Sequence, residues 1–364
     1  MQVLVMGGTQ FNGLALVHEL VRNGHAVTVL NRGKTRAALP RSVTRLVADR
    51  TDAASMRAVL GGLEFDCIFD VSAYRTDDVK LMVELFRGRV GHYVFISSTV
   101  IYAASDLLPI SEDFPLDASP QQNEYGRNKI DCEHLLLREW RARQFPASIV
   151  ALSMVFGPHN LVPDREQRMF ARILQGRPVL IPGDGQTIAQ VGHVDDQARA
   201  LRMMMQKSAT FGRRYNLTGN DYFTGNGYVD ECARAIGMDA NRVYIPAPLM
   251  DEVFDGHVAL RPNAKSTTDP GSLSKAQSRA SNQWMLSTLV QHVAPHIHRW
   301  NRNVVFGIER LREDVGWTPA YNFRAAVQQT WAWFQSDPVA STREFDFTFE
   351  EQVLAYVRKS EGRL

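Results

Sequence analysis

Cysteine is scarce in this sequence, and long apolar runs and a strong net charge are absent. The 364 residues include three cysteines, Cys67, Cys132 and Cys232, which are far apart and odd in number. They indicate a reducing compartment and exclude a disulfide framework, and their spacing is not that of metal ligands. We therefore expect no bound metal.

The apolar segments are too short to cross a membrane. None approaches the roughly 20 residues that a spanning helix needs, and the first residues read as a buried strand, without the basic and apolar regions of a signal peptide. We expect a cytoplasmic protein. The net charge of +2 gives no overall electrostatic basis for binding nucleic acid or membranes, so we expect neither as a partner.

The first 156 residues alternate between strand and helix patterns. Short, continuous apolar runs predict strands at 2–6, 26–31, 45–48, 67–71, 93–96 and 148–152. Strands without a polar face are typical of a parallel sheet that is covered on both sides. The alternation predicts an α/β fold, a Rossmann-type doubly wound sheet that binds a dinucleotide.

The second half is less regular, with glycine- and proline-rich loops between shorter helices. We expect residues 157–334 to form a smaller, mixed lobe over the substrate, with some elements returning to the large sheet, and 335–364 to form a tail. An insertion near 250–303 includes a stretch at 260–279 that is rich in Ser, Thr, Lys, Arg and Pro, which predicts a mobile or partly disordered loop.

A glycine-rich turn follows the first strand. Gly7, Gln10 and Gly13 occupy the positions of a G-x-x-G-x-x-G fingerprint, with Gln10 at the usual middle glycine and with Thr9 and Phe11 beside it. The turn leads from a predicted strand into a helix, whose free N–H groups and positive dipole end favour a pyrophosphate. The alternative is a purely structural turn.

The end of the second strand favours NADP(H) over NAD(H). An acidic residue here would bind the adenosine ribose and repel a 2′-phosphate, but the sequence has Asn31, followed by Arg32 and Lys34. We expect Arg32 to stack on adenine and bind the phosphate, helped by Lys34 or Arg36. A solvated basic loop is the alternative, and NAD(H) stays open.

Two further strand ends complete the expected cofactor site. Asp49 follows the third strand and is placed to receive the adenine amino group. Ser72 and Ala73 follow the fourth strand and are expected to line the ribose and nicotinamide side.

A tyrosine and a lysine four residues apart form the candidate catalytic pair. On a helix, Tyr125 and Lys129 share one face. The ordinary pKa of tyrosine is near 10, and a neighbouring ammonium and the oxidised nicotinamide favour the phenolate. We expect Tyr125 to act as acid and base, Lys129 to tune it and hold the nicotinamide ribose, and Ser98 to orient the substrate oxygen. The pair alone occurs by chance in many helices, but its place after Ser98 and the glycine turn favours catalysis.

These motifs resemble the extended short-chain dehydrogenase/reductase superfamily, which includes the NAD-dependent epimerase/dehydratase family. The likeness covers about residues 1–240 and returns at 311–334. The glycine turn, the basic loop at 32–34 and the stretch 190–196 are most similar to an atypical branch of chloroplast stem-loop-binding proteins and bacterial epimerase-like relatives. The resemblance implies a Rossmann fold, a nicotinamide cofactor and a Tyr–Lys–Ser mechanism.

Two departures from that family narrow the chemistry. Thr99 and Val100 stand where dehydratases of nucleotide sugars carry an acidic pair, which argues against 4,6-dehydration. The stretch 188–190 lacks the arginine that grips the diphosphate in many nucleotide-sugar enzymes, which weakens the case for such a substrate. Other arginines are candidates for that role, namely Arg165, Arg168, Arg172 and Arg261.

The sequence thus predicts an enzyme that transfers a hydride between the nicotinamide and a small-molecule secondary alcohol or ketone. One alternative is a nucleotide-sugar epimerase that works through a transient ketone. Another is an RNA-binding protein on a redox-enzyme fold, which the intact Tyr–Lys pair and the near-neutral charge disfavour. A homodimer is left open. The histidines His292, His296 and His298 are expected at the surface.

Overall fold

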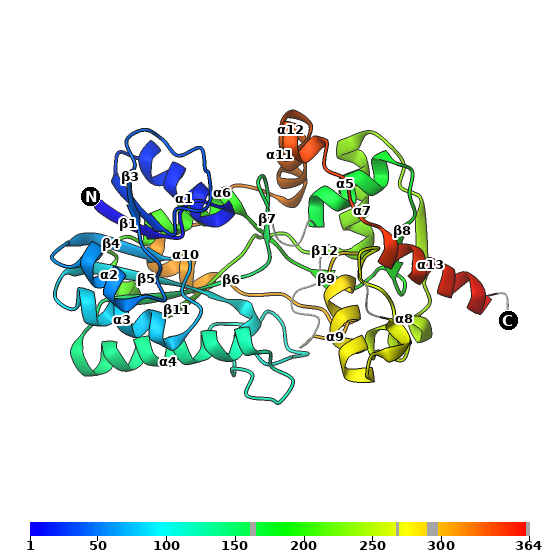
Figure 1. Cartoon of the computed structure of the whole chain (residues 1–364), viewed down its shortest axis with the longest axis horizontal. Coiled ribbons are helices and arrows are strands. Elements are labelled where there is room, and N and C mark those ends of the chain that lie inside the picture. The colour runs from blue at the N-terminus through cyan, green and yellow to red at the C-terminus, as the bar shows by residue number, and fades with distance from the viewer. Residues whose placement is uncertain (161–164, 267–268, 290–297, 362–364) are drawn as a thin grey trace.

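A seven-stranded parallel sheet forms one half of the molecule (Figure 1). The computed structural model describes residues 1–160, 165–266, 269–289 and 298–361. The strand order is β11-β6-β5-β4-β1-β2-β3. The strands are β1 (Gln2–Met6), β2 (Ala26–Asn31), β3 (Thr44–Val47), β4 (Phe65–Asp70), β5 (Val90–Ser98), β6 (Ala147–Leu152) and β11 (Arg214–Leu217). This sheet confirms the predicted Rossmann-type α/β fold.

Helices cover both faces of this sheet (Figure 1). Successive residues of β1 point to opposite faces, so Val3 and Val5 pack on one side while Leu4 and Met6 pack on the other. The first side carries α1 (Phe11–Arg22), α6 (Val194–Met204) and α10 (Glu309–Val315). The second side carries α2 (Ala53–Leu60), α3 (Thr76–Phe86) and α4 (Glu124–Arg143). Strands β1 and β6 consist almost entirely of apolar residues because both of their faces are buried.

The remaining elements form a second lobe, at the right in Figure 1. Its helices pack around small two-stranded sheets. The paired strands are β7 (Val155–Phe156) with β10 (Gly192–His193), β9 (Ile188–Ala189) with β12 (Phe223–Thr224), and β8 (Val179–Pro182) with β13 (Arg242–Ile245). The helices are α5 (Arg165–Leu174), α7 (Gly225–Ile236), α8 (Ala247–Phe254), α9 (Lys275–Leu286), α11 (Phe323–Ser336), α12 (Pro338–Ser341) and α13 (Thr348–Glu361).

The expectation of an irregular stretch at 260–279 is corrected at its end, because α9 begins at Lys275. Ser274 and Gln277 form a reciprocal capping box at the start of this helix. The side chain of Asn282 then donates to the Val253 and Val258 carbonyls at 2.7 and 2.8 Å, which ties α9 to α8 and to the segment after it. The Ser-x-x-Gln signal was present in the sequence, among polar residues that obscured it.

The histidine prediction is also corrected in part. His298 is buried, whereas a surface position was expected. His292 and His296 lie outside the described residues.

No helix in the described part of the chain is long and apolar enough to cross a membrane.

The C-terminal segment packs on the body of the same chain. Arg168 of α5 donates to the Asp346 carbonyl at 2.7 Å and to Glu350 at 3.0 Å, and Arg172 forms a buried ion pair with the same Glu350. The guanidinium groups of Arg168 and Arg172 also lie over the ring of Phe347. Helix α13 is therefore an integral part of the second lobe.

Candidate active site

A cavity of about 750 Å³ lies at the carboxyl ends of β1, β2, β4 and β5, where open parallel sheets bind ligands. It brings together every predicted cofactor-binding and catalytic residue except Ala73 and Arg36, which was the alternative to Lys34. These are Gly7, Thr9, Gln10, Phe11, Gly13, Asn31, Arg32, Lys34, Asp49, Ser72, Ser98, Tyr125 and Lys129.

The glycine turn between β1 and α1 leaves no room for side chains at two of its positions. Gly7 has a φ of +93°, which favours glycine. A Cβ at Gly13 would lie 2.2 Å from the Gly7 carbonyl oxygen, so the start of α1 packs directly on the turn. Gln10, the N-cap, makes no side-chain hydrogen bond to the helix. The first N–H groups of α1 therefore have no side-chain cap and face the cavity that Asn12 and Gly13 line.

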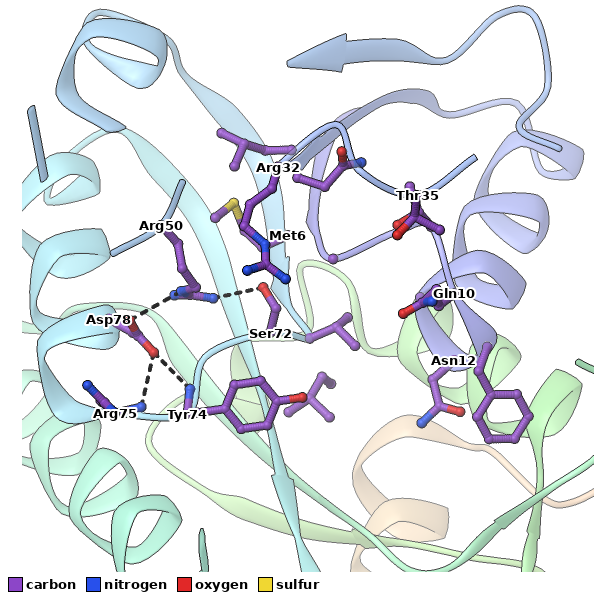
Figure 2. Close-up of a pocket in the computed structure, with 18 of the residues that line it drawn as sticks. Met6, Gln10, Asn12, Arg32, Thr35, Arg50, Ser72, Tyr74, Arg75 and Asp78 are labelled. Atoms are coloured by element: carbon purple, nitrogen blue, oxygen red, sulfur yellow. Dashed lines mark hydrogen bonds and ion pairs between the residues drawn. The ribbon is translucent and has the colours of Figure 1, made fainter. Parts of the chain in front are cut away.

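The basic loop after β2 lies on the cavity wall. The side-chain oxygen of Asn31 accepts a hydrogen bond from the Gly33 N–H at 2.8 Å, which shapes the loop. The side chain of Arg32 extends into the cavity toward Ser72 (Figure 2). In the described part of the chain, neither Arg32 nor Lys34 forms a salt bridge with an acidic residue. Both cations are therefore available to an anionic ligand.

Asp49 lines the same end of the cavity and remains ionised. Its carboxylate accepts hydrogen bonds from the Thr51 N–H at 3.0 Å and from the Thr51 hydroxyl at 2.7 Å. These bonds lower the pKa of Asp49, and the charges of Arg32 and Lys34 contribute. Asp49 is therefore a hydrogen-bond acceptor on the cavity wall.

The sequence reasoning missed Arg50, which lies on the cavity wall between two acids. Its guanidinium donates to both carboxylate oxygens of Asp70 at 2.7 and 3.0 Å. It also donates to the Ser72 hydroxyl at 2.9 Å and lies 3.4 Å from Asp78 (Figure 2). The Tyr93 hydroxyl donates to Asp70 at 2.7 Å. Burial alone would raise the pKa of Asp70, but Arg50, the Tyr93 hydroxyl and Lys129 together lower it. This network fixes Ser72 at the centre of the site.

Ala73 plays a different part from the one predicted. It is fully buried and does not line the cavity. Its carbonyl oxygen accepts a hydrogen bond from the Lys129 ammonium at 2.7 Å, and the Ile96 carbonyl accepts a second at 2.6 Å. Ala73 therefore contributes its backbone to the position of Lys129. An ammonium has three N–H donors, so one remains after these two bonds.

Tyr125 and Lys129 lie one turn apart near the start of α4, as predicted. The side chain of Asn123 caps this helix by accepting from the Gly126 N–H at 2.7 Å. The Lys129 nitrogen is 5.6 Å from the centre of the Tyr125 ring and 4.7 Å from that of Phe95. Lys129 is almost completely buried, whereas 39% of Tyr125 is exposed toward the cavity. The cation therefore lies beneath a phenol that a ligand can reach.

The predicted lowering of the tyrosine pKa is not found in the protein by itself. Burial raises the pKa of Tyr125 to about 12, proximity to Tyr74 adds to the shift, and a hydrogen bond with Ser98 opposes it. Burial lowers the pKa of Lys129 to about 8, although the Asp70 charge acts in the opposite direction. At neutral pH Tyr125 is thus a protonated phenol that can donate its proton.

A further turn of α4 places Glu133 behind the site. It is fully buried, accepts from the Ser97 hydroxyl at 2.5 Å, and is paired with Arg214 of β11 through a hydrogen bond of 2.6 Å. These bonds join α4 to the end of β5, where Ser98 follows Ser97. They fix the spacing between Ser98 and the helix that carries Tyr125.

Tyr74 is a second cavity residue that the sequence reasoning missed. Its backbone N–H donates to Asp78 at 2.9 Å, and its ring projects into the cavity (Figure 2). The ring centre is 6.0 Å from that of Tyr125, and the Lys129 nitrogen is 5.1 Å away. With Phe95 and Tyr125, it surrounds the ammonium with aromatic rings, which attract cations.

Gln190 belongs to the stretch 188–190, which lacks the arginine that grips a diphosphate in many nucleotide-sugar enzymes. It is buried, its amide nitrogen donates to the Gly219 carbonyl at 2.6 Å, and its oxygen accepts from the Phe306 N–H at 2.8 Å. Both ends of this amide are used within the protein. Arg168 and Arg172 are held by Glu350, as described above, so neither replaces the missing arginine.

His193, at the start of α6, has a structural role, because its ring packs and bonds within the protein. Its ring stacks on Tyr321 with centres 3.8 Å apart, and its Nδ1 accepts from the Asp195 N–H at 3.3 Å. The residues that the structure describes contain no cluster of His, Cys, Asp and Glu suited to a metal ion.

Comparisons with known proteins agree with this geometry. Residues 3–218 match the model of the NAD dependent epimerase/dehydratase family, and the chain belongs to this family. The chain is 30% identical over 250 residues to the chloroplast stem-loop binding protein of 41 kDa b from Arabidopsis thaliana, covering 65% of this chain and 64% of the relative. It is 24% identical to the 2′-dehydrokanamycin reductase of Streptomyces kanamyceticus, over 68% of this chain and 70% of that enzyme.

The fold is also that of known enzymes. The structure of UDP-glucose 4-epimerase from Thermotoga maritima with UDP-glucose aligns with a TM-score of 0.69 and 18% identity, and covers 92% of this chain and 99% of the other. The family is described as NAD-dependent, and the solved structure shares its fold with this chain.

Proposed function

We propose that this protein is an NAD(P)-dependent oxidoreductase that transfers a hydride between the nicotinamide and a secondary alcohol or ketone. The observation that carries the proposal is the arrangement of Tyr125, Ser98 and Lys129 at one end of the cavity. The phenol is accessible, the Ser98 hydroxyl acts to lower its pKa, and a cation is buried beneath it.

The protein groups supply the proton chemistry of this reaction. When bound, the nicotinamide supplies or accepts the hydride. In the reducing direction, Tyr125 donates its proton to the carbonyl oxygen, and Ser98 donates a hydrogen bond to the same oxygen. The Lys129 ammonium stabilises the negative charge that develops on the phenol oxygen. A phenol with a pKa of about 12 is protonated at neutral pH and is therefore suited to this direction.

NADP(H) is the proposed cofactor. Asn31 replaces the acid that would repel a 2′-phosphate, and Arg32 and Lys34 line the cavity without acidic partners in the described structure. The start of α1 would hold the pyrophosphate, Asp49 the adenine amino group, and Lys129 the nicotinamide ribose. We propose a small-molecule substrate and a cytoplasmic enzyme.

The second candidate is epimerisation of a nucleotide-linked sugar, which the likeness to UDP-glucose 4-epimerase favours. It would use the same tyrosine and a cofactor that stays bound. The internal bonding of Gln190 counts against a diphosphate at that position. RNA binding is a third candidate because of the stem-loop-binding relative. RNA binding does not explain why Lys129 is buried beside an accessible Tyr125.

The test begins with the purified protein, which is denatured so that any released nucleotide can be identified by mass. Absence of nucleotide together with binding of added NADPH supports a reductase that exchanges its cofactor, whereas retained NAD supports an epimerase. NADPH oxidation is then measured with a panel of keto sugars and simple aliphatic ketones. Tyr125→Phe should abolish turnover and preserve NADPH affinity, while Tyr222→Phe, at an exposed tyrosine outside the cavity, should change neither. Full activity of Tyr125→Phe would refute the mechanism.

A further inference from the structure

The side chain of Ser72 lies where the loop after β4 meets the glycine turn. A Cβ at Gly7 would lie 3.0 Å from the Ser72 Cβ and 3.3 Å from its hydroxyl oxygen, so this side chain packs directly against the turn. Both residues line the cofactor cavity, and Figure 2 shows Ser72 near its middle. Helix α1, whose start is the proposed pyrophosphate site, follows the same turn. The hydroxyl is therefore beside the part of the cavity that the pyrophosphate would occupy.

The oxygen of this hydroxyl already accepts a hydrogen bond. Arg50 donates to it at 2.9 Å while it also holds both oxygens of Asp70. The Arg50 side chain is 13% exposed, and its Nε lies 3.4 Å from Asp78, so its position is fixed from several sides. Because an arginine has no acceptor atom, the Ser72 hydroxyl proton cannot be directed toward Arg50.

The nearest carboxylate, that of Asp70, does not take this proton either. A carboxylate has about four lone-pair sites. One oxygen of Asp70 accepts from Arg50 at 2.7 Å and from the Ser72 backbone N–H at 3.3 Å. The other accepts from Arg50 at 3.0 Å and from the Tyr93 hydroxyl at 2.7 Å. Asp70 therefore has no site left for the Ser72 hydroxyl.

The Ser72 proton is thus left for a ligand. Among the described residues, none accepts a hydrogen bond from the Ser72 hydroxyl. A hydroxyl that accepts a bond from a cation becomes a better donor, because successive hydrogen bonds polarise one another. The charge of Arg50 itself is balanced by Asp70. The pair therefore presents an uncharged but polarised donor to the cavity.

We propose that Arg50 is a positioning residue that fixes the Ser72 hydroxyl as a hydrogen-bond donor to the pyrophosphate of a bound dinucleotide. This inference rests on the proposed function, because it requires the cavity to bind a nicotinamide cofactor. The pyrophosphate is common to NADPH and NADH, so Ser72 adds affinity for both cofactors alike. Arg32, in contrast, is proposed to bind the 2′-phosphate that only NADPH carries.

The first test measures the dissociation constants of NADPH, NADH and ADP-ribose with the full-length protein by titration calorimetry. ADP-ribose keeps the pyrophosphate and lacks the nicotinamide. Ser72→Ala should weaken all three ligands about tenfold, because a hydrogen bond to a charged group is lost. Ser42→Ala is the matched control and should change none of them, since Ser42 is exposed and does not line the cavity.

The second test asks whether Arg50 acts through Ser72. Arg50→Lys keeps a positive charge beside Asp70 but loses the planar fork that reaches Asp70 and Ser72 together. We expect it to weaken the three ligands about fivefold in the wild type, and less than about twofold further when Ser72 is already alanine. Melting temperatures are measured for every variant, and Arg50→Gln takes the place of Arg50→Lys if the lysine variant does not fold.

The inference is overturned if Ser72→Ala binds the ligands as tightly as the wild type, or if ADP-ribose alone keeps its affinity. It is also overturned if the losses from the Arg50 and Ser72 variants add in the double variant, because Arg50 would then act independently of Ser72. With NADPH binding intact in the wild type, these results concern the inference alone. A wild-type protein that binds none of the three ligands would refute the proposed function as well.

Discussion

The ammonium of Lys129 lies 5.6 Å from the centre of the Tyr125 ring and is bonded to backbone carbonyls, not to a carboxylate. The cation is thus buried without a bonded counter-ion, and burial lowers its pKa to about 8. The proton on Lys129 is held loosely enough to be lost within an accessible pH range.

We expect ketone reduction to fall as the pH rises through about 8. Lys129 loses its charge there and no longer stabilises the phenolate, whereas Tyr125, with a pKa of about 12, stays protonated. The measurement is kcat/KM against pH, with NADPH affinity measured over the same range to remove effects on the cofactor. A profile that stays flat well above pH 8 would contradict the role of Lys129.

The same lysine should make stability rise with pH. In the unfolded chain it stays protonated up to its ordinary pKa of 10.5, but in the folded protein only up to about 8. Between these values the unfolded state binds more protons, so rising pH favours the folded state. Urea unfolding across this range should show a steeper rise for the wild type than for Lys129→Met. Parallel curves would contradict the shift.

Arg32→Ala should weaken NADPH binding by about 10- to 100-fold and NADH binding by much less, because a charged hydrogen bond to the 2′-phosphate is lost. The measurement is the dissociation constant of each cofactor by fluorescence titration. Arg36→Ala is the control, since Arg36 belongs to the same loop but does not line the cavity. Equal loss for both cofactors would remove the case for NADP(H).

Arg50→Ala should lower the free energy of unfolding by about 3–5 kcal/mol, because Asp70 would be left as a buried charge without its partner. The pKa of Asp70 is lowered in the folded protein, so its contribution is present at neutral pH and is lost as the pH falls through that lowered value. Urea unfolding at neutral and acid pH measures both effects. Arg57→Ala, at the exposed pair Arg57–Glu84, should cost under about 1 kcal/mol.

Glu350→Gln should destabilise the C-terminal lobe by about 3–5 kcal/mol, because Arg172 is buried and would lose its counter-ion. The neighbouring exposed residue supplies the control: Glu351→Gln breaks only the surface pair with Arg177 and should cost under about 1 kcal/mol. Thermal and urea unfolding measure both. Similar values for the two variants would show that α13 is not anchored through Glu350.

The sheet, the glycine turn and the Tyr–Lys pair could be predicted because each is a local pattern. Apolar runs identify strands that are buried on both faces, and a spacing of four residues sets Tyr125 above Lys129 on one helix face. The Ser274–Gln277 capping box is equally local, and a closer reading of its spacing would have found α9.

The remaining features of the site join residues that are far apart in the chain. Arg50 and Asp70 are 20 residues apart, and Arg172 and Glu350 are 178 apart. No periodicity links such pairs, and the sequence around an arginine does not show whether its charge is free or paired with an acid. The sequence likewise does not show that Gln190 is bonded at both ends of its amide, because its partners, Gly219 and Phe306, are far away in the chain.

The sequence by itself determined the fold class, the position of the dinucleotide turn and the identity of Tyr125, Lys129 and Ser98 as neighbours at one strand end. Local backbone preferences and side-chain periodicity suffice for these features. Only the tertiary structure decided that Arg32 has no acidic partner among the described residues, whereas Arg50, Arg168 and Arg172 are paired with acids. It also decided that burial raises the pKa of Tyr125. Charge, burial and accessibility depend on which distant segments meet, and that is settled by packing.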